Sequence, residues 1–579
     1  MTRRLARFAF DRGFLLGLAV LVAYVWLAPT TIVAGDNAEF ATLGAVGGRA
    51  HPSGYPLYVL WLRALAWLPA ASAAHRAAIA TALLAGVQTI VLHAACRAWG
   101  ARPSAAALAV ATFAAAPIVL RVHTEADVFA LNSLVGAAIL WLAAATGPVR
   151  GTWRCGLLGL VAGLGLANNL TCVLLAPIGL LGVVRGMREG SVRTGILVAL
   201  GGLALGMLPY AYLVVAPDAA SWGPIDSFDD LVGTFLRRDY GYASHRPDAP
   251  SIPLLTSLGA HAMLVGRSFL WAPALLGLGT LAWRCVRGAD RWGWAMLALS
   301  WLLAGPVFAW RLDVDPSGVG GYIGGRMQIL SAVVLAIPVA RGLEAIAART
   351  QREIRPALAA GFAVLWFGGL AALALPRLAR VHSAVVEVGV RNQLRALPPD
   401  SILIVVSDDQ CFGTRYLQLA LGERRDVTLV CWALARHRWY RERLAHAGLT
   451  LARTDGGVAT VAQGEALLAT GRPLVVDRAQ TAILGALPSQ PLGVLVRVLP
   501  RGARVPSLGE VVELQREVYA AFDFDYPRPT RDDDFGSVAH VRYAQPWQLL
   551  ATQLLAAGDR AGAVAAHELA EQLAPLPAD

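Results

Sequence analysis

The chain has 579 residues, of which 56% are hydrophobic and only 15% charged, with a formal net charge of +11. Soluble globular proteins carry about 25% charged residues, so the composition excludes an ordinary soluble enzyme and predicts a polytopic membrane protein. The positive charge lies in short arginine clusters between apolar stretches, which is typical of cytoplasmic loops and argues against a nucleic-acid partner.

The N-terminal segment predicts a retained membrane helix. Four arginines, the last of them Arg12, precede an apolar stretch that runs to about Ala34. This stretch is longer than the apolar core of a signal peptide and suits a first span. We therefore expect a cytoplasmic N-terminus and an external loop directly after the first span.

Further apolar stretches of spanning length follow. We place them near 76–97, 103–120, 128–147, 194–216, 261–283, 292–310, 326–347 and 356–375. The stretch 155–184 is long for one span and short for two, and Asn168 and Asn169 lie at its middle, so we expect two short helices that turn there. The arginine clusters all fall on the cytoplasmic side only if this stretch crosses twice, which gives about eleven spans and an external C-terminal domain.

From about Pro376 the composition changes to that of a small extramembrane domain. Alternating elements predict an α/β fold with a parallel sheet: strands at 401–406 and 426–432, and helices at 414–421 and 438–447. The last stretch, 547–575, predicts two helices with a turn at Gly558, similar to a single tetratricopeptide-type hairpin. We divide the chain into a transmembrane domain (1–376), an external α/β domain (377–545) and a C-terminal helical hairpin (546–579).

The six cysteines form no CxxC pair, so they carry no zinc or redox signature, and we expect neither a metal nor a cofactor. Cys411 and Cys431 could pair if their domain faces an oxidising compartment. The residue pattern favours separate buried thiols instead.

Asp36 and Glu39 are the most unusual polar residues, because they follow the first span where a membrane helix meets water. On a short helix their spacing would put both carboxylates on one face. One could act as a general base while the other orients an acceptor or stabilises positive charge. Alternatively, Asp36 could cap the helix and Glu39 complete a capping box. The pattern alone favours neither interpretation.

Other polar residues gather on the same external face. His51 and Tyr55 lie in a turn with two prolines and a glycine, where His51 could contact a ligand and Tyr55 could be an interfacial anchor. Glu125 and Asp127 lie at the mouth of a span, where acids are often only solvated. Asn132 lies deeper and should find a partner inside the protein.

The external loop after residue 216 contains Trp222 and the run Arg237-Arg238-Asp239-Tyr240. External arginines run against the positive-inside trend, and anion binding is one reason for such an exception, because guanidinium groups match phosphate oxygens. Arg326 is a second exception. The alternative is pairing with nearby acids, namely Asp226, Asp229, Asp230 and Asp239. No phosphate loop, GxSxG or HExxH motif occurs.

Several rare motifs occur in order along roughly residues 10–445, and together they resemble a known family. They are Gly35-Asp-x-x-Glu-Phe40, His51-Pro-x-Gly-Tyr-Pro56, Asp127-Val-Phe-Ala-Leu-Asn132, Gly165-Leu-x-x-Asn-Leu-Thr171, Trp222-Gly223, Arg237-Arg-x-Tyr240, Ser407-Asp-Asp-Gln410, Tyr416-Leu-Gln418, Arg425-Asp-Val427 and Trp439-Tyr440. The chain is similar to bacterial members of the protein O-mannosyltransferase-like family, formerly domain of unknown function 2723, whose animal relative is transmembrane protein 260.

The resemblance implies a GT-C glycosyltransferase fold and an enzyme that takes a sugar from a polyprenyl-phosphate carrier. It implies that Asp36 is the catalytic acid residue, with Glu39 beside it. Our hypothesis is that the carboxylate of Asp36 acts as the general base. His51 and Tyr55 would then shape the sugar or acceptor pocket. The full set of substrate- or donor-binding candidates is His51, Tyr55, Glu125, Asp127, Asn132, Asn169, Trp222, Arg237, Arg238, Tyr240 and Arg326, with the three arginines as candidates for the carrier phosphate.

The sequence therefore predicts an α-helical polytopic protein of the bacterial inner membrane that moves a sugar, with mannose as the candidate, to a hydroxyl of a protein or glycan on the periplasmic face. Its expected partners are membrane lipids, the lipid-linked sugar and the acceptor. One alternative is a transporter or flippase for a lipid-linked or anionic solute, but transporters tend to place charges at the bilayer midplane and to contain inverted repeats. Another alternative is a non-catalytic membrane scaffold.

Overall fold

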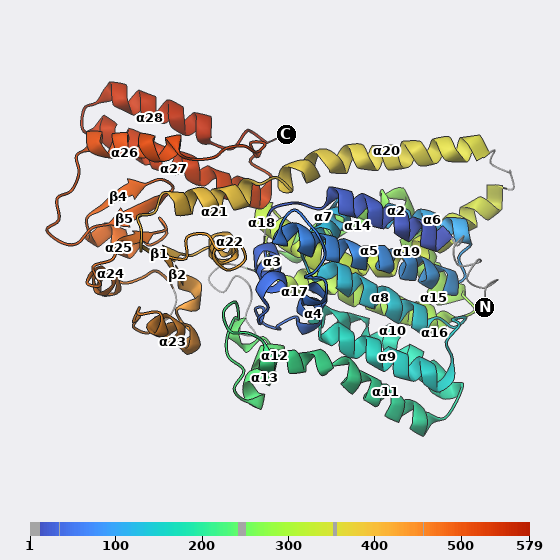
Figure 1. Ribbon diagram of the computed structural model, residues 1–579. Helices are drawn as coiled ribbons and strands as arrows, with labels where there is room; N and C mark the ends of the chain where they lie inside the picture. The colour runs from blue at the N-terminus through green and yellow to red at the C-terminus, as the bar shows by residue number, and fades with distance from the viewer. Residues whose placement is uncertain (1–11, 34, 241–250, 351–355, 455–456, 579) are drawn as a thin grey trace.

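A computed structural model describes residues 12–33, 35–240, 251–350, 356–454 and 457–578. An elongated helical bundle contains the chain up to α20, and a smaller part with helices and a sheet, from α21 onward, lies at one end of it (Figure 1). We call these the membrane part and the C-terminal part.

The membrane part contains the following elements: α2 (Arg12–Leu27), α3 (Asn37–Val46), α4 (Pro56–Ala64), α5 (Ala73–Ala98), α6 (Pro103–Ala114), α7 (Pro117–Thr124), α8 (Phe129–Ala143), α9 (Gly151–Leu166), η1 (Leu170–Leu175), α10 (Ala176–Arg188), α11 (Val192–Gly206), η2 (Leu208–Tyr210), α12 (Ala211–Val215), α13 (Phe228–Phe235), η3 (Arg238–Tyr240), α14 (Leu254–Phe269), α15 (Ala272–Arg287), α16 (Arg291–Leu302), η4 (Leu303–Val307), α17 (Phe308–Leu312), α18 (Gly318–Met327), α19 (Ile329–Thr350) and α20 (Pro356–Val381).

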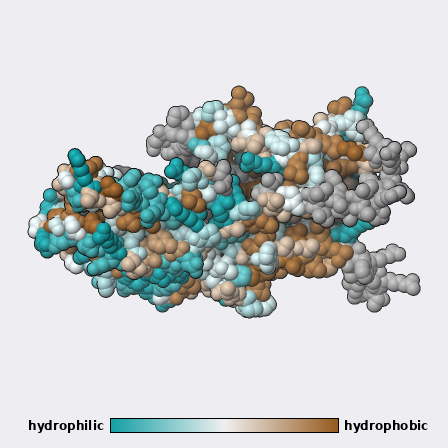
Figure 2. Space-filling view, turned by 90° about the horizontal axis from the view of Figure 1, so that it is seen from above, coloured by the Kyte–Doolittle hydropathy of each residue, from teal (hydrophilic) through white to brown (hydrophobic). Residues whose placement is uncertain are grey.

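Within the described residues, six helices are long and apolar enough to cross a membrane, or up to eight if each of two bent pairs counts as one span. Three further apolar helices, α2, α8 and α9, are shorter. Apolar side chains also dominate the outer surface of the bundle, whereas the end formed by the C-terminal part is mostly hydrophilic (Figure 2). The chain is therefore a multi-pass membrane protein, and the eleven spans stay a prediction.

The structure breaks the apolar stretches at particular residues. The expected turn at Asn168-Asn169 is confirmed, since α9 ends at Leu166 and η1 begins at Leu170. The expected span at 261–283 is not one straight helix, because α14 and α15 meet at 107°. Leu270 has a left-handed backbone there, and Pro273 in the first turn of α15 has no N–H to continue the hydrogen bonds of α14.

The stretch 103–120 is likewise not one straight helix. α6 and α7 are bent by 70° at a break that directly precedes Pro117. A proline disfavours the helical conformation of the residue before it, so the chain changes direction at this point. The bend carries the end of α7 and the loop after it toward α18, where α7 and α18 are in contact.

The C-terminal part contains α21 (Val385–Arg395), β1 (Ile402–Val405), α22 (Asp408–Leu419), β2 (Thr428–Cys431), η5 (Trp432–Leu434), α23 (Arg438–His446), α24 (Val461–Leu468), β3 (Leu474–Val476), α25 (Thr481–Ala486), β4 (Ser489–Leu492), β5 (Leu495–Val498), α26 (Leu508–Ala520), α27 (Asp534–Ala556) and α28 (Arg560–Leu573). The two expected strands are confirmed as β1 and β2, and the expected helices as α22 and α23, although α22 begins at Asp408, earlier than expected.

The sheet has the strand order β2-β1-β3-β5-β4. β1 pairs in parallel with β2 and β3, so the expected parallel pairing of the two predicted strands is confirmed, whereas β5 is antiparallel to both β3 and β4. The antiparallel pair arises because β4 and β5 are joined by a two-residue turn that starts at Gly493, whose positive φ of 59° suits a tight hairpin.

α27 and α28 pack against each other as a helical pair that turns at Gly558, which also has a positive φ. α27 begins at Asp534, upstream of the expected start at Trp547. The likeness to a tetratricopeptide hairpin and the three domain ranges stay predictions. The expected boundaries after residues 376 and 545 fall inside α20 and α27.

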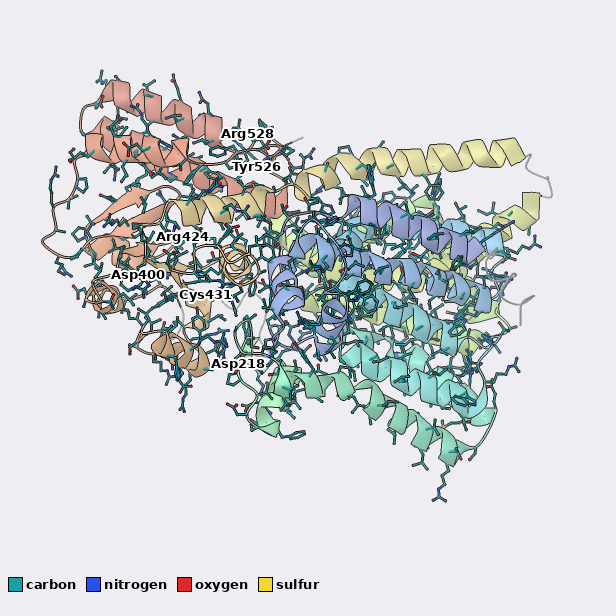
Figure 3. The ribbon with its side chains drawn as sticks, in the orientation of Figure 1. Asp218, Asp400, Arg424, Cys431, Tyr526 and Arg528 are labelled. Atoms are coloured by element: carbon teal, nitrogen blue, oxygen red, sulfur yellow. A yellow bond between two sulfur atoms is a disulfide. The ribbon has the colours of Figure 1, made fainter. Side chains whose placement is uncertain are left out.

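A disulfide joins Cys411 to Cys431, so the preference for separate thiols is wrong. Cys411 lies in the first half of α22 and Cys431 ends the neighbouring strand β2, which puts their Cα atoms 5.6 Å apart, within the usual range for a disulfide. Figure 3 shows Cys431 in the C-terminal part, above the external loop that carries Asp218.

Candidate functional site

Asp36 and Glu39 face partners in the folded protein instead of capping their own helix. Asp36 occupies the N-cap position of α3, but its carboxylate makes no capping hydrogen bond and accepts one from Nη2 of Arg326 at 2.8 Å. Glu39 accepts a hydrogen bond from the backbone N–H of His51 at 2.9 Å, and its other oxygen lies 2.5 Å from Nδ1 of the same residue. The capping-box interpretation is therefore wrong.

Arg326 joins two acids from distant parts of the chain. It lies in α18, is 7% exposed, and donates from Nη1 to Asp127 at 2.9 Å as well as from Nη2 to Asp36. Burial would raise the pKa of Asp36, but Arg326 and His51 outweigh it and lower that pKa below its usual value. Burial raises the pKa of Asp127 to about 6, although Arg326 opposes the shift. One guanidinium thus serves two carboxylates, and Asp36 is the one held firmly ionised.

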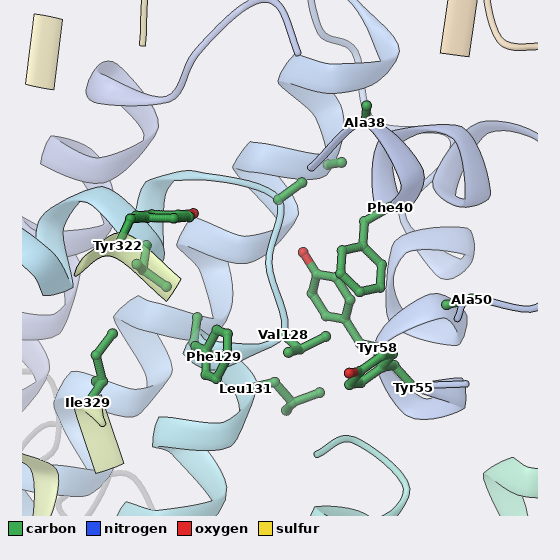
Figure 4. Packing of buried hydrophobic residues seen from close by; sticks show 14 of the residues in the cluster. Ala38, Phe40, Ala50, Tyr55, Tyr58, Val128, Phe129, Leu131, Tyr322 and Ile329 are labelled. Carbon is green, nitrogen blue, oxygen red and sulfur yellow. The ribbon is translucent and has the colours of Figure 1, made fainter. Parts of the chain in front are cut away.

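His51 forms a buried pair with Glu39. Burial would lower the pKa of His51, but the carboxylates of Glu39 and Asp36 raise it above its usual value, so we expect a charged imidazole near neutral pH. Its ring centroid lies 5.0 Å from that of Tyr55 and 6.1 Å from that of Trp222. Figure 4 shows the ring of Phe40, on α3, packed beside Tyr55 and Tyr58, which holds the turn after α3 against the helix.

A cavity of about 130 Å³ lies where the membrane part meets the C-terminal part. Three predicted residues line it from the membrane side: Asp36, His51 and Trp222. The C-terminal part contributes Val406, Asp408, Cys411, Phe412, Cys431, Ala433, Leu434 and Arg436. The candidate site is therefore built by both parts of the chain, and the disulfide forms part of its wall.

Asp408 is the cavity residue that sequence reasoning missed. It starts α22 directly after strand β1, and its carboxylate makes no hydrogen bond within the part of the chain that the structure describes. The residue is exposed at the cavity, where partial loss of solvent raises the pKa of its carboxyl to about 6, and the nearby Asp36 adds to the shift. The sequence feature that could have identified Asp408 is the acid pair Asp408-Asp409 after a buried strand, because ligands often bind beyond the carboxyl ends of parallel strands.

A second, larger depression of about 530 Å³ lies beside α18. It is lined by α7, α14, α17, α18 and α20, and by Asp532 and Asp534 of the C-terminal part. Its wall is mainly apolar but includes the side chains of Arg121, Arg267 and Arg377. Tyr322 of α18 lines this groove, whereas Arg326 on the same helix reaches Asp36 at the cavity. α18 therefore contributes to both regions, with Tyr322 in the groove wall and Arg326 in the contact with Asp36.

Three further predicted ligand-binding residues make contacts inside the protein. Glu125 accepts hydrogen bonds from Arg121 at 3.0 Å and from the hydroxyl of Tyr322 at 2.6 Å. Asn132 donates to the hydroxyl of Thr171 at 2.9 Å, which confirms the expected partner inside the protein, and Asn169 accepts from the same hydroxyl. None of these three residues lines the cavity or the groove.

The paired arginines of the external loop have different surroundings. Arg238 is exposed and donates to Asp229 at 2.8 Å, so the pairing alternative applies to it. Arg237 is half-buried and close enough to Asp36, His51 and Tyr55 to influence the pKa of each. Of the two, only Arg237 is near the cavity.

The remaining loop candidates are Trp222 and Tyr240. The indole of Trp222 lines the cavity and donates to Asp239 at 3.0 Å, which ties the loop to itself beside the site. Tyr240 ends η3, and its side chain lies outside the described residues. Within those described residues, no group of three or more histidine, cysteine or acidic side chains could hold a metal ion.

Comparison with known proteins gives two findings. Residues 36–190 match the family model for the N-terminal domain of protein O-mannosyl-transferase TMEM260. The chain is also 24% identical over 454 residues to the mouse (Mus musculus) protein named Protein O-mannosyl-transferase TMEM260. That alignment covers 74% of this chain and 63% of the mouse protein, so the chain spans less than two thirds of this relative. The family match begins at Asp36, and both findings show that the chain is similar to TMEM260-like O-mannosyltransferases.

Proposed function

We propose that the protein is a membrane glycosyltransferase that moves a sugar, with mannose as the candidate, from a polyprenyl-phosphate carrier to a hydroxyl of a protein acceptor. The observation that supports this most directly is the Arg326 bridge to Asp36 and Asp127, which lies between an apolar groove and an aqueous-side cavity. The name of the mouse relative supports the sugar and the acceptor class.

The groove suits the lipid-linked donor. Its apolar wall between α14 and α20 would bind the hydrocarbon chain, and its arginines would attract the phosphate. A lipid-phosphate donor brings its own leaving group, so the chemistry requires no nucleotide-binding loop and no cofactor. It requires a group that accepts the proton of the attacking hydroxyl and cations that receive the departing phosphate.

The reaction can be written with the residues at the bridge. The acceptor oxygen attacks the anomeric carbon, its proton passes to the carboxylate of Asp36, and the bond from that carbon to the phosphate oxygen breaks with its electron pair on the phosphate. Arg326 receives the developing phosphate charge. As Arg326 turns toward phosphate, its hold on Asp36 weakens and the carboxylate becomes more basic, which couples donor binding to proton acceptance.

We further propose that the site lies on the periplasmic face of a bacterial inner membrane, with the N-terminus in the cytoplasm. The arginine distribution along the sequence supports this orientation. The disulfide Cys411–Cys431 supports it as well, because disulfides persist in oxidising compartments such as the periplasm.

Sugar transfer by the purified protein in lipid vesicles tests the proposal. The donor probes are polyprenyl-phosphate mannose with a radioactive sugar and, as the control, a nucleotide-linked mannose; the acceptor probe is a short peptide with one threonine. We expect labelled peptide from the lipid-linked donor only. Transfer from the nucleotide sugar without lipid carrier, or no transfer from either donor, would contradict the proposal.

The two neighbouring arginines of the external loop form a matched pair of variants. Arg237→Ala should raise the apparent KM for polyprenyl-phosphate mannose by roughly tenfold to a hundredfold, as expected for loss of one charge-assisted contact. Arg238→Ala should change it less than about threefold, because Arg238 already pairs with Asp229 at the exposed surface. Steady-state kinetics with varied donor measure both effects. Equal donor KM values for the wild type and Arg237→Ala would remove Arg237 from the donor site.

A further inference from the structure

Three carboxylates lie close together at the cavity, and they differ in whether a cation balances their charge. At the cavity, Asp36 is balanced by Arg326, and Glu39 by His51. The carboxylate of Asp408 has no such partner among the described residues. Arg436, which lies in the cavity wall, donates to the backbone oxygen of Asp239 at 3.0 Å and to His437 at 3.1 Å. Around Asp408 the cavity therefore favours a neutral hydrogen-bond donor over a second anion.

The cavity is also small. Its volume is about 130 Å³, which gives room for one short side chain. Apolar surface from Trp222, Phe412 and the disulfide surrounds the polar groups. A serine or threonine side chain, with a hydroxyl on a small apolar stem, fits these dimensions and this lining.

The C-terminal part is held over the cavity by contacts with the external loop. Arg443 donates to the backbone oxygen of Ser221 at 2.7 Å, and Arg436 reaches the same loop at Asp239. The rings of Trp222 and Trp439 lie 6.3 Å apart across this junction. α22 itself packs against α3, which places Asp408 in the same cavity as Asp36 and His51.

We infer that Asp408 of the C-terminal part binds the acceptor, and that its carboxylate accepts a hydrogen bond from the serine or threonine segment whose hydroxyl is placed beside Asp36. The inference rests on the proposed function. In this assignment both parts of the chain bind substrate: the membrane part binds the donor, and the C-terminal part completes the pocket for the acceptor. A peptide hydroxyl is thus presented from the cavity, while the lipid-linked sugar approaches from the groove.

Asp408→Asn tests this assignment, because it keeps the size of the side chain and removes its charge. We expect the KM for the threonine peptide to rise roughly tenfold to a hundredfold, with kcat and the KM for polyprenyl-phosphate mannose each changed less than about threefold. Glu513→Gln on α26 is the matched control, since this carboxylate is exposed, pairs with Arg516 and lies outside the cavity. It should leave all three constants unchanged.

The pH dependence provides a readout that a purely structural role would not produce. Asp408 faces Asp36, Glu39 and His51 across the cavity, with Asp409 beside it on α22 and Arg436 in the same wall. As pH falls through about 6, Asp408 gains a proton and loses its charge, so the wild-type peptide KM should rise. In Asp408→Asn this rise should be absent or much smaller.

Direct binding keeps the test independent of catalysis. The fluorescence anisotropy of a labelled threonine peptide, measured with full-length protein in lipid nanodiscs, should show weaker binding to Asp408→Asn than to wild type. Equal affinities, or a loss confined to kcat with an unchanged peptide KM, would overturn the assignment. If the wild type transfers sugar normally while these results occur, only the role of Asp408 fails and the proposed function stands.

Discussion

Replacing Asp36 with asparagine should lower kcat for sugar transfer by about 10²–10⁴-fold, the usual contribution of a positioned general base. Asparagine keeps the shape of the side chain but cannot accept the proton of the attacking hydroxyl. It also removes one of the two anions that Arg326 contacts, so part of the loss will reflect a less firmly placed guanidinium. Initial rates with saturating polyprenyl-phosphate mannose and threonine peptide measure the effect.

Asp226→Asn is the control for this experiment. Asp226 is an exposed acid in the external loop, and it lines neither the cavity nor the groove, so the same chemical change there should leave kcat within about twofold of wild type. Thermal unfolding of both variants separates loss of chemistry from loss of fold. A stable Asp36→Asn protein with near wild-type kcat would remove Asp36 from the catalytic role.

The sequence identified the two acids after the first span but could not choose between helix cap and catalytic group. That choice depends on which donor each carboxylate reaches. The partner of Glu39 is only twelve residues away, whereas Arg326 is 290 residues from Asp36. No local sequence pattern indicates a contact between two residues so far apart in the chain. The external location of Arg326, inferred from its exception to the positive-inside trend, was the nearest available clue.

Local patterns predicted elements better than they predicted how the elements join. The break at Asn168-Asn169 and the strands β1 and β2 follow from chain length and apolar content, and all are present. The sharp bend near Leu270 depends on one residue with a left-handed backbone, and a stretch of apolar residues does not indicate such a conformation. The antiparallel β4–β5 pair depends in the same way on the short turn at Gly493.

Asp408 shows why the side of the cavity formed by the C-terminal part was not predicted. Its motif is present in the sequence, but composition alone does not show how the C-terminal part packs against the membrane part. The contacts that dock it join residues far apart in the chain, such as Arg443 to Ser221 and Arg121 to Asp534. The disulfide partners were identified as a possibility, and only the packing of α22 against β2 shows that they meet.

Arg121→Met should destabilise the junction between the two parts by about 3–5 kcal/mol, which is the usual cost of removing one partner of a buried ion pair. Arg121 is 7% exposed and donates from Nη1 and Nη2 to Asp534 at 2.8 and 3.0 Å, and from Nε to Glu125 at 3.0 Å. Its guanidinium also lies 3.8 Å from the centre of the Tyr322 ring. Methionine fills much of the volume but leaves two carboxylates without their shared cation.

Arg516→Met provides the contrast, because Arg516 forms an exposed pair with Glu513 and such pairs contribute about 0–1 kcal/mol. Thermal unfolding and limited proteolysis of the protein in nanodiscs measure both variants. For Arg121→Met we expect a lower unfolding temperature and faster cleavage between α20 and α21, since Asp534 starts the helix that packs on α21. Sugar transfer should fall with it, because α22 and Asp408 are placed through the same junction. If Arg121→Met and Arg516→Met unfold and cleave alike, the buried cluster does not hold the C-terminal part over the cavity.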